Sequence, residues 1–291
     1  MTLPAHHTKH LPILETRFQS SAFSLSQRAD GISNGTALWL GAQVLSSYLA
    51  DALPAPKPSA DAHRPCILEL GSGIGFSALA LATLGYDVQA TDTSHVIASV
   101  LEPNITANAK RLSPNAGRIS VRELDWTVPP EHWNWDHAST IASPAALTPS
   151  SAPADPTNIA TFNLQERSYP HPPFAAIISA DTLYEPALVT PLLRTLHAAA
   201  SLSPSASSSS RSTPVFLCVE RRDPAVIDAA LEEAVNVWRF SLERVPKRKL
   251  SKALDRAGFT GWKAEDWDGM EVYKLVLKGG SLTRQPTIST G

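Results

Sequence analysis

A glycine-rich turn constrains the fold of this chain more than any other feature. The apolar run Cys66–Leu70 is followed by glycines at alternate positions, Gly71, Gly73 and Gly75, and Phe76–Leu84 then has the apolar content of a buried helix. Glycines let the backbone turn sharply and let a ligand approach the free N–H groups at the start of the helix. The sequence therefore predicts either a ligand-binding turn between a strand and a helix or a tight turn without a ligand.

The spacing of these glycines separates the candidate ligands. A dinucleotide-binding turn places its third glycine three positions after the second, where this chain has Phe76. The Lys-Ser/Thr pair of a nucleoside-triphosphate loop is also missing. The turn suits a cofactor that has no phosphate but carries a cationic amino group, and Glu69 at the strand end is placed to orient the residues that hold this group.

Strands and helices alternate along the rest of the chain. The patterns predict strands at 66–70, 87–90, 119–124, 174–180 and 215–219, and helices at 76–84, 94–110, 186–199 and 224–240. Ser94 is expected to cap its helix, and Pro103 to kink or split it. The segments 262–267 and 271–277 are expected to pair as an antiparallel end of the sheet. Repeated βα units of this kind predict a doubly wound α/β domain.

Low-complexity segments interrupt this pattern. Residues Ala138–Ala160 and Ser201–Pro214 consist mostly of Ala, Ser, Thr and Pro without a periodic apolar face, so both are expected to be mobile loops. Pro54–Pro65 resembles a linker. The expected organisation is an N-terminal extension at 1–30, one domain at 31–279 with these two insertions, and a flexible tail at 280–291.

Composition excludes several classes of function. The chain has 25 Lys and Arg against 27 Asp and Glu, a formal net charge of −2, which provides no field for unspecific binding of nucleic acid or an anionic membrane. Cys66 and Cys218 are the only cysteines and are expected to be reduced core residues. We expect a cytoplasmic and/or nuclear protein, because the sequence has neither a signal peptide nor an apolar membrane span. The basic cluster Lys247–Lys249 is either a helix start, the preferred interpretation, or a nuclear import signal.

Carboxylates follow the second and third predicted strands. Asp92 can accept hydrogen bonds from both hydroxyls of a ribose, or cap the next helix. Asp125 can accept a bond from an adenine amino group, and Trp126 offers an aromatic face to the same base. Because the carboxyl ends of parallel strands meet at one edge of a sheet, these side chains are expected to share one site with the glycine turn.

The fourth strand is followed by Asp181 and Tyr184, three positions apart. A helical turn would place both side chains on one side, where a carboxylate and a phenol can hold and desolvate a nucleophilic amine. The alternative is a surface aspartate that caps the helix above a packed tyrosine. The sequence contains no nucleophile elbow, no Ser-His-Asp order and no metal-ligand spacing, so we expect no metal.

At these positions the chain resembles the seven-β-strand, S-adenosylmethionine-dependent methyltransferases, and most of all family 16, whose characterised members are mainly protein-lysine methyltransferases. The resemblance runs from about Phe23 to Leu277 and rests on Gly35–Trp39, Glu69–Gly75, Asp92, Asn104, Asn108, Leu124–Trp126, Asp181–Tyr184 and Glu220–Arg222. Within the family, Arg122–Trp126 and Glu220–Arg222 look closest to the methyltransferase-like 22 branch.

The resemblance implies a seven-stranded, mostly parallel, Rossmann-like sheet and S-adenosylmethionine as the cofactor. It implies a cofactor site formed by Trp39, Glu69, Gly71, Ser72, Gly73, Gly75, Asp92, Asp125, Trp126 and Ala180. Asp181 would then recognise the target amine and Tyr184 would align it. The expected enzyme is a monomer that methylates a lysine of a protein substrate.

Three alternatives stay open beside this expectation. The same fold can methylate a small amine, or bind the cofactor without catalysis as an interaction module. A nucleic-acid methyltransferase is disfavoured, because enzymes that act on a base amine usually stack the flipped base on an Asn/Asp-Pro-Pro-Tyr/Phe loop, and this chain has Asp181–Tyr184 there without prolines.

Overall fold

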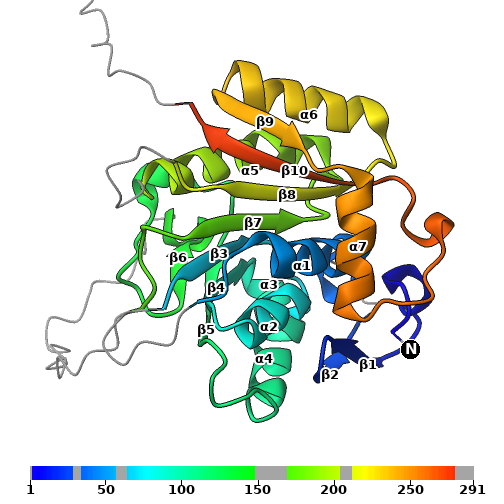
Figure 1. Ribbon diagram of the computed structural model, residues 1–291. Helices are drawn as coiled ribbons and strands as arrows, with labels where there is room; N and C mark the ends of the chain where they lie inside the picture. The colour runs from blue at the N-terminus through cyan, green and yellow to red at the C-terminus, as the bar shows by residue number, and fades with distance from the viewer. Residues whose placement is uncertain (1, 29–33, 57–63, 148–168, 204–211, 279–291) are drawn as a thin grey trace, which may run out of the picture.

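An eight-stranded sheet forms the centre of the protein (Figure 1). The structure is a computed structural model that describes residues 2–28, 34–56, 64–147, 169–203 and 212–278. The strand order is β6-β5-β4-β3-β7-β8-β10-β9, parallel from β6 to β8, with β10 antiparallel to both β8 and β9. The predicted doubly wound, mostly parallel α/β fold is confirmed, with eight strands in the sheet instead of the expected seven.

The strands of the sheet are β3 (Cys66–Leu70), β4 (Asp87–Asp92), β5 (Ile119–Leu124), β6 (Thr140–Ala142), β7 (Ala176–Ala180), β8 (Val215–Glu220), β9 (Phe240–Arg244) and β10 (Met270–Leu277). The helices are α1 (Leu40–Ala52), α2 (Phe76–Thr83), α3 (Ser94–Val96), α4 (Glu102–Ala109), α5 (Pro186–Ser201), α6 (Pro224–Asn236) and α7 (Lys247–Ala257). A separate hairpin consists of β1 (Ile13–Phe18) and β2 (Ser21–Ser26).

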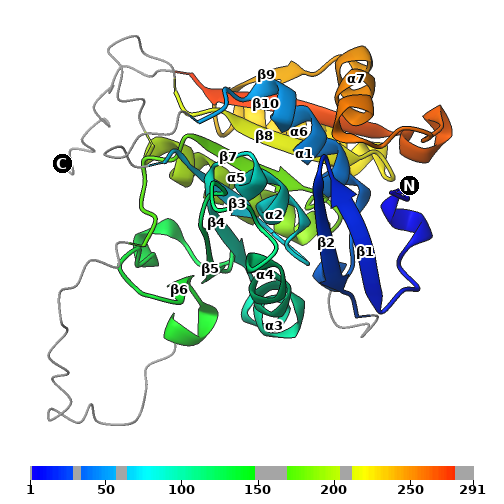
Figure 2. The same ribbon diagram turned by 60° about the horizontal axis from the view of Figure 1, so that its bottom comes forward.

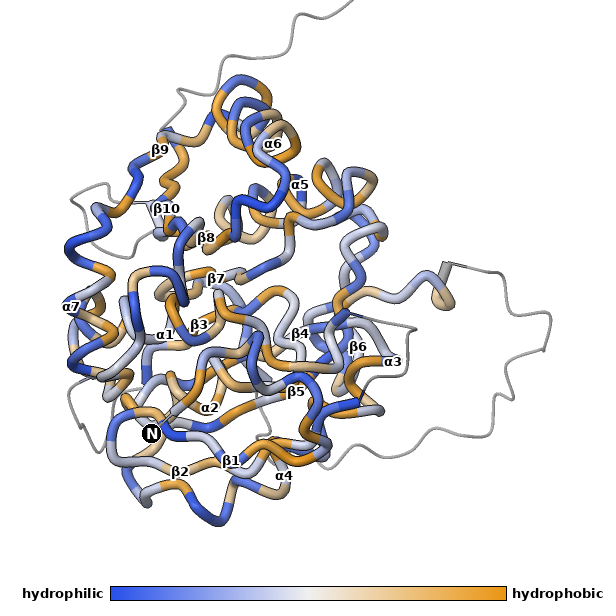
Figure 3. Tube along the Cα trace, turned by 90° about the vertical axis from the view of Figure 1, so that its right-hand side faces the viewer, coloured by the Kyte–Doolittle hydropathy of each residue, from blue (hydrophilic) through white to orange (hydrophobic). Residues whose placement is uncertain are grey.

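Both faces of the sheet are apolar, because successive side chains of a buried parallel strand point to opposite sides. Ile67 of β3 belongs to a core formed with α1, α2, α4 and α7, whereas Leu68 belongs to a second core formed with α5 and α6. Figure 3 shows the hydrophobic colour concentrated along the central strands β3 and β7. No helix in the described ranges is long and apolar enough to cross a membrane.

The hairpin β1–β2 is tied to the domain by two asparagine side chains of α4 and lies beside this helix (Figure 2). Asn104 exchanges hydrogen bonds with the backbone of Ser26 at 2.8 and 3.0 Å, and Asn108 does the same with Ser24 at 2.9 and 2.8 Å. Each amide thus satisfies an N–H and a C=O that a neighbouring strand would otherwise pair. The N-terminal residues from 2 to 28 are therefore packed onto the domain.

The helix predicted at 94–110 is interrupted, as Pro103 required. The residues Ile97–Leu101 form a π-helical stretch between α3 and α4, and Pro103 lies in the first turn of α4. Proline has no N–H and its ring crowds the preceding turn, so an irregular turn before it is expected. The predicted cap is wrong: Thr93 occupies the N-cap position, and Ser94 is the first residue of α3.

The C-terminal third differs from the prediction in two places. Helix α6 ends at Asn236, and Arg239, with a φ of +59°, redirects the chain so that Phe240 begins strand β9. The segment 262–267 forms no strand, since it contains only a 3-10 turn from Ala264 to Trp267. The antiparallel partners of β10 are β8 and β9, where the apolar side chains of Phe240 and Leu242 join the core.

The first predicted insertion is partly ordered. Within 138–160, the residues Thr140–Ala142 form edge strand β6, because Ile141 supplies a large apolar side chain that is buried beside β5. Expecting a mobile loop there was wrong, and 148–160 lies outside the described residues. Trp133 and Trp135 pack edge to face beside this strand and do not line the cavity described below.

The remaining low-complexity segments are only partly within the structure. In 201–214, Ser201 still belongs to α5, and the Thr213 hydroxyl bonds the carbonyls of Phe174 (3.0 Å) and Ser203 (2.5 Å). These bonds fix both ends of the segment, so that its expected mobility is wrong there. Residues 204–211, 57–63 of the expected linker, and the tail from 279 lie outside the described ranges. Cys66 and Cys218 are both free thiols, and Cys218 is fully buried.

Candidate active site

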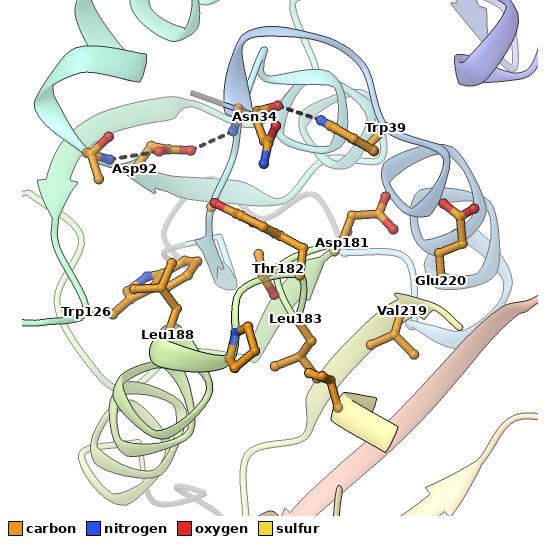
Figure 4. Close-up of a pocket in the computed structure, with 18 of the residues that line it drawn as sticks. Asn34, Trp39, Asp92, Trp126, Asp181, Thr182, Leu183, Leu188, Val219 and Glu220 are labelled. Atoms are coloured by element: carbon orange, nitrogen blue, oxygen red, sulfur yellow. Dashed lines mark hydrogen bonds between the residues drawn. The ribbon is translucent and has the colours of Figure 1, made fainter. Parts of the chain in front are cut away.

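A cavity of about 540 Å³ opens at the carboxyl ends of β3, β4, β5, β7 and β8 (Figure 4). This is the edge at which open α/β sheets bind their ligands, and the size suits a small organic molecule. Nine of the twelve predicted site residues line it: Trp39, Gly71, Gly73, Asp92, Asp125, Trp126, Ala180, Asp181 and Tyr184. The three others, Glu69, Ser72 and Gly75, lie outside its lining.

The glycine turn forms one wall because no side chain fits there. Gly71 has a φ of +74°, and a Cβ on it would lie 2.8 Å from Thr182 Cγ2 and 3.2 Å from Trp126 Cζ2. The backbone N–H groups of Gly71 and Ser72 donate to the carbonyl of Thr91 at 3.0 and 2.9 Å. The turn is thus fixed against β4 and presents bare backbone to the cavity.

Glu69 supports this turn from below. Its side chain is 3% exposed and hydrogen-bonded to Ser72 and Ser77, while Oε2 is buried without a partner among the described residues. Burial raises the pKa of this carboxyl to about 7, although the two serine hydroxyls oppose the shift. The position agrees with a role in orienting the turn, which is how the sequence placed Glu69.

Asp92 is fixed at the end of β4 by backbone donors. Its Oδ2 accepts from Gly73 N at 2.9 Å and its Oδ1 from Thr93 N at 2.8 Å. Burial raises the pKa of Asp92 to about 6, against these two bonds. Each carboxylate oxygen can accept a further hydrogen bond, so Asp92 keeps the capacity to hold ribose hydroxyls.

Trp126 forms the opposite wall, near Leu188 (Figure 4). Its backbone carbonyl accepts from Arg194 Nη2 at 2.8 Å, which ties the strand end to α5. The indole Nε1 is buried and has no hydrogen-bond partner in the described part of the chain. The neighbouring Asp125 uses Oδ1 to accept from the N–H and the hydroxyl of Thr127, at 2.8 and 2.6 Å.

These features fit S-adenosylmethionine, the cofactor that the family resemblance implies. Buried polar groups without a partner are rare, and the Trp126 Nε1 donor is satisfied if a ligand supplies an acceptor. Gly71 leaves room for a close approach that any side chain would block. Asp92 retains acceptor capacity for ribose hydroxyls, and the Trp126 ring offers an adenine its aromatic face.

Asp181 occupies the other end of the cavity in an uncommon conformation, with a φ of +56°. Its Oδ2 accepts from Gly41 N, at the start of α1, at 2.5 Å, and a Cβ on Gly41 would lie 2.5 Å from this oxygen. Its Oδ1 is buried without a partner within the described ranges. Burial and the nearby Glu220 raise the pKa of Asp181 to about 7, and the Gly41 bond and two cations oppose this shift.

The alternative in which Asp181 caps the following helix is not what the structure shows. Glu185 is the N-cap of α5, and its side chain accepts from Ala187 N at 3.4 Å. Asp181 instead accepts a hydrogen bond from the backbone N–H of Gly41 at the N-terminus of α1. Tyr184 is 53% exposed at the rim of the cavity and therefore does not pack beneath a cap.

Trp39 lies close to Asp181 and Glu220 (Figure 4). Two cationic side chains lie over its ring. The Lys9 Nζ atom lies 3.1 Å from the ring centroid, and the Arg222 Cζ atom lies 4.7 Å from it. The indole Nε1 donates to the Asn34 carbonyl at 2.6 Å. Sequence reasoning missed Lys9 and Asn34, because neither belongs to a motif or follows a strand.

One further group of potential ligands lies outside the cavity. His6, His7 and Asp266 bring their ligand atoms within 4.8 Å of one another, but both histidines are exposed. Exposed groups of this kind are common without a metal, and the sequence predicted none.

Solved methyltransferases are among the structures that superpose on this chain. The magnesium protoporphyrin IX methyltransferase of Synechocystis PCC 6803, solved with bound SAH, superposes with a TM-score of 0.43 and 12% identity, over 81% of this chain and 82% of that chain. A human methyltransferase 10 domain containing protein superposes with a TM-score of 0.43 and 9% identity, over 83% and 84%.

Sequence comparison shows a partial similarity to lysine methyltransferases. Mouse methyltransferase-like protein 22 is 29% identical and human methyltransferase-like protein 22 is 32% identical, each over 93 residues, or 32% of this chain. The match spans 22% of the mouse protein and 21% of the human protein, about a fifth of their length. Residues 17–140 match the family model of lysine methyltransferases. The resemblance expected from the sequence is therefore confirmed as a similarity, and the matched residues 17–140 contain Trp39, the glycine turn, Asp92 and Trp126. The expected similarity to the methyltransferase-like 22 branch is confirmed over 93 residues.

Proposed function

We propose that this protein is an S-adenosylmethionine-dependent methyltransferase that acts on the side-chain amine of a lysine in a protein substrate. One observation carries the proposal. A single cavity joins Asp92 and Trp126 at one end to Asp181 at the other, with Tyr184 in its lining, in a chain whose residues 17–140 match lysine methyltransferases.

Asp92, Trp126 and the glycine turn would hold the cofactor. S-adenosylmethionine supplies, when bound, a methyl group on a cationic sulfonium. The protein then has to align the acceptor amine and exclude water from it, since an in-line displacement depends mainly on position. Asp92 would bind the ribose and Trp126 the adenine, which leaves the Asp181 end for the acceptor.

The acceptor lysine must lose a proton before it can attack. Its unperturbed pKa is about 10.4, so the neutral amine costs roughly 4–5 kcal/mol at neutral pH. Asp181 Oδ1, buried and unpartnered among the described residues, would receive the incoming ammonium. The same carboxylate stabilises the charged form, so we assign Asp181 to recognition, and desolvation in the cavity to the loss of the proton. Tyr184 would align the amine from the rim.

A protein acceptor agrees better with this rim than a small metabolite does. Tyr184 is 53% exposed, and the side chain of Arg222 beside Trp39 is 54% exposed. An enclosed pocket around a small amine would bury these side chains. A lysine side chain is long enough to enter from a protein that stays outside.

Calorimetry tests the cofactor site directly. The wild-type chain is expected to bind S-adenosylmethionine, and Asp92→Ala to bind it roughly tenfold to a hundredfold more weakly, because a hydrogen bond to a charged group contributes about 1.5–3 kcal/mol. Asp255→Ala, an exposed carboxylate on α7, is the matched control and should bind like the wild type. A wild-type chain that binds no S-adenosylmethionine would overturn the proposal.

Methyl transfer tests the acceptor. Incubation of the wild type and of Asp181→Ala with tritiated S-adenosylmethionine and cell extract is expected to label a discrete protein band with the wild type only. Mass spectrometry then locates the methylated lysine. Label confined to small molecules would favour a metabolite methyltransferase, and cofactor binding without any transfer would favour an interaction module.

We also propose that the protein works as a monomer in the cytoplasm or the nucleus, without direct contact to nucleic acid. The cluster Lys247–Lys249 begins helix α7, and Lys247 Nζ lies 2.5 Å from Asp268 Oδ1, which supports the interpretation as a helix start. Light scattering tests the mass in solution. Imaging of the wild type beside Arg248→Gln/Lys249→Gln tests nuclear import.

A further inference from the structure

Lys9 brings a lysine ammonium to the end of the cavity where the proposed function places a substrate lysine. Its Nζ atom lies 3.1 Å from the centroid of the Trp39 ring, and Trp39 itself lines the cavity. The carboxylates of Glu220 and Asp181 are near enough to interact with this cation electrostatically, and both also line the cavity. An aromatic face with carboxylates beside it is a suitable receptor for an ammonium group.

The position of Lys9 is built into the fold. The buried Gln27 side chain donates from Nε2 to the carbonyls of Thr8 and Leu11, both at 2.9 Å, on either side of Lys9. The Oε1 atom of the same amide accepts from Leu38 N, next to Trp39, at 2.8 Å. A single side chain thus connects the backbone around Lys9 to the backbone beside Trp39.

In the described part of the chain, the ammonium contacts the Trp39 ring without forming an ion pair of its own. Within the described ranges, Lys9 has no carboxylate within 4.0 Å, whereas Glu220 forms its ion pair with Arg222. Arg222 also lies over the Trp39 ring, with its Cζ atom 4.7 Å from the centroid. Burial and this second cation lower the pKa of Lys9, while Glu220 and Asp181 oppose the shift. Two like charges at one ring are not the arrangement of a contact that serves only stability.

We propose that the Trp39 face, together with Glu220 and Asp181, is the subsite that receives the substrate's lysine ammonium, and that Lys9 occupies it as an intramolecular competitor until a substrate displaces it. This inference rests on the proposed function, since it names the acceptor subsite of that activity. Lys9 thereby contributes to specificity, because a substrate lysine enters the subsite only if it binds there more tightly than Lys9 does.

Nuclear magnetic resonance tests the occupancy on the full chain with isotope-labelled lysine. The ring current of Trp39 should shift the Lys9 Cε protons upfield, and Lys9→Arg identifies the signal by its loss. Adding Nα-acetyl-lysine N-methylamide should move this signal towards the value of an exposed lysine. A Lys9 signal that keeps its shifted position at saturating probe would overturn the proposal.

Affinity for the same probe gives the second measurement. Lys9→Gln removes the competitor and is expected to bind the probe roughly 3- to 30-fold more tightly than the wild type. Lys9→Arg keeps a cation at the ring and should bind like the wild type. Equal affinities of the wild type and Lys9→Gln, or no binding by Lys9→Gln, would contradict the proposal.

The proposed function and this inference fail in different ways. Failure of the proposed function appears as a wild-type chain that does not bind S-adenosylmethionine. Failure of the inference appears as unchanged probe affinity on loss of Lys9, in a chain that still binds S-adenosylmethionine. The double variant Lys9→Gln/Glu220→Gln separates the subsite from the competitor, since it should lose most of the affinity that Lys9→Gln gains.

Discussion

The two ends of the cavity differ in how their polar groups are satisfied. At the end with Asp92 and Trp126, the carboxylate of Asp92 is bonded to the backbone of Gly73 and Thr93, and the Trp126 Nε1 donor has no partner among the described residues. At the end with Trp39 and Asp181, four ionisable groups from three segments lie near one another, two cations and two carboxylates. The Asp92 carboxylate at the first end is fixed by backbone hydrogen bonds, whereas the side chains at the second end interact mainly through their charges.

This difference suits the two ligands of a methyl transfer. Adenine and ribose are neutral, and fixed hydrogen-bond partners recognise them by shape. An acceptor lysine arrives as a cation, and exchanging it for the Lys9 ammonium leaves the net charge at that end unchanged. The desolvation cost of bringing a new charge into the cavity is thereby largely offset.

The largest expected effect comes from a substitution at the end of the cavity that contains Asp92 and Trp126. In Gly71→Ala, a Cβ 2.8 Å from Thr182 Cγ2 and 3.2 Å from Trp126 Cζ2 forces these side chains to move. Overpacking of this kind costs about 1–3 kcal/mol, so calorimetry should show S-adenosylmethionine binding up to roughly a hundredfold weaker. Gly258→Ala is the matched control, because its φ of +93° brings the same backbone strain with nothing within 4 Å. Equal losses in both variants would show that backbone strain, and not the cavity wall, matters.

The next effect is expected from the buried carboxyl of Glu69. The folded pKa of Glu69 is about 7, above its ordinary value of 4.5, so the native state binds more protons than the unfolded state between these values. The stability that this group contributes is present below about pH 4.5 and is lost as the pH rises through 7. Chemical denaturation should therefore show the wild type losing about 3 kcal/mol relative to Glu69→Gln between pH 4 and pH 8.

The exposed Glu102 on α4 provides the control for this comparison. The free energy of unfolding of Glu102→Gln should follow that of the wild type at every pH. Parallel curves for Glu69→Gln and the wild type would mean that the Glu69 carboxyl is not the source of the pH dependence.

The sequence predicted the first end of the cavity far better than the second. Gly71, Asp92 and Trp126 each follow a strand, and parallel strands bring their carboxyl ends together in any doubly wound sheet. Local patterns therefore suffice to place them. Asp181 was placed at the cavity in the same way, but its bond to Gly41 joins residues 140 positions apart, and no local pattern encodes such a contact.

The same limit applies to the rest of the fold. The strands with continuous apolar runs, such as β3 and β7, were predicted closely, because burial on both faces leaves a clear pattern. Strand β9 was missed, since its start depends on the left-handed conformation of Arg239, which side-chain type does not reveal. The contact between Lys9 and Trp39 depends on Gln27, whose three hydrogen bonds exist only after the chain has folded.

Gly41→Ala tests the end of the cavity with Trp39 and Asp181 without changing the end with Asp92 and Trp126. Its Cβ would lie 2.5 Å from Asp181 Oδ2, so the carboxylate must leave its place at the start of α1. We expect kcat/KM for the methylated protein to fall roughly tenfold, as is usual for a displaced recognition group worth about 1.4 kcal/mol. The affinity for S-adenosylmethionine, measured by calorimetry, should stay within about twofold. A parallel loss of cofactor affinity would show that the two ends are coupled.

The smallest expected effect concerns the hydrogen bonds by which α5 holds the backbone of Trp126. Arg194 Nη2 donates to the carbonyls of Trp126 and Thr127 at 2.8 and 3.1 Å. Arg194→Met keeps the apolar stem of the side chain but removes both hydrogen bonds that Nη2 donates. The Trp126 wall then loses a support but no contact to the ligand. Because one hydrogen bond contributes about 0.5–1.5 kcal/mol net, S-adenosylmethionine should bind roughly threefold more weakly, with probe binding at the Trp39 end unchanged. A loss as large as that of Gly71→Ala would instead mean that the first end is held by its connection to α5, and that its rigidity is not a property of the strand ends alone.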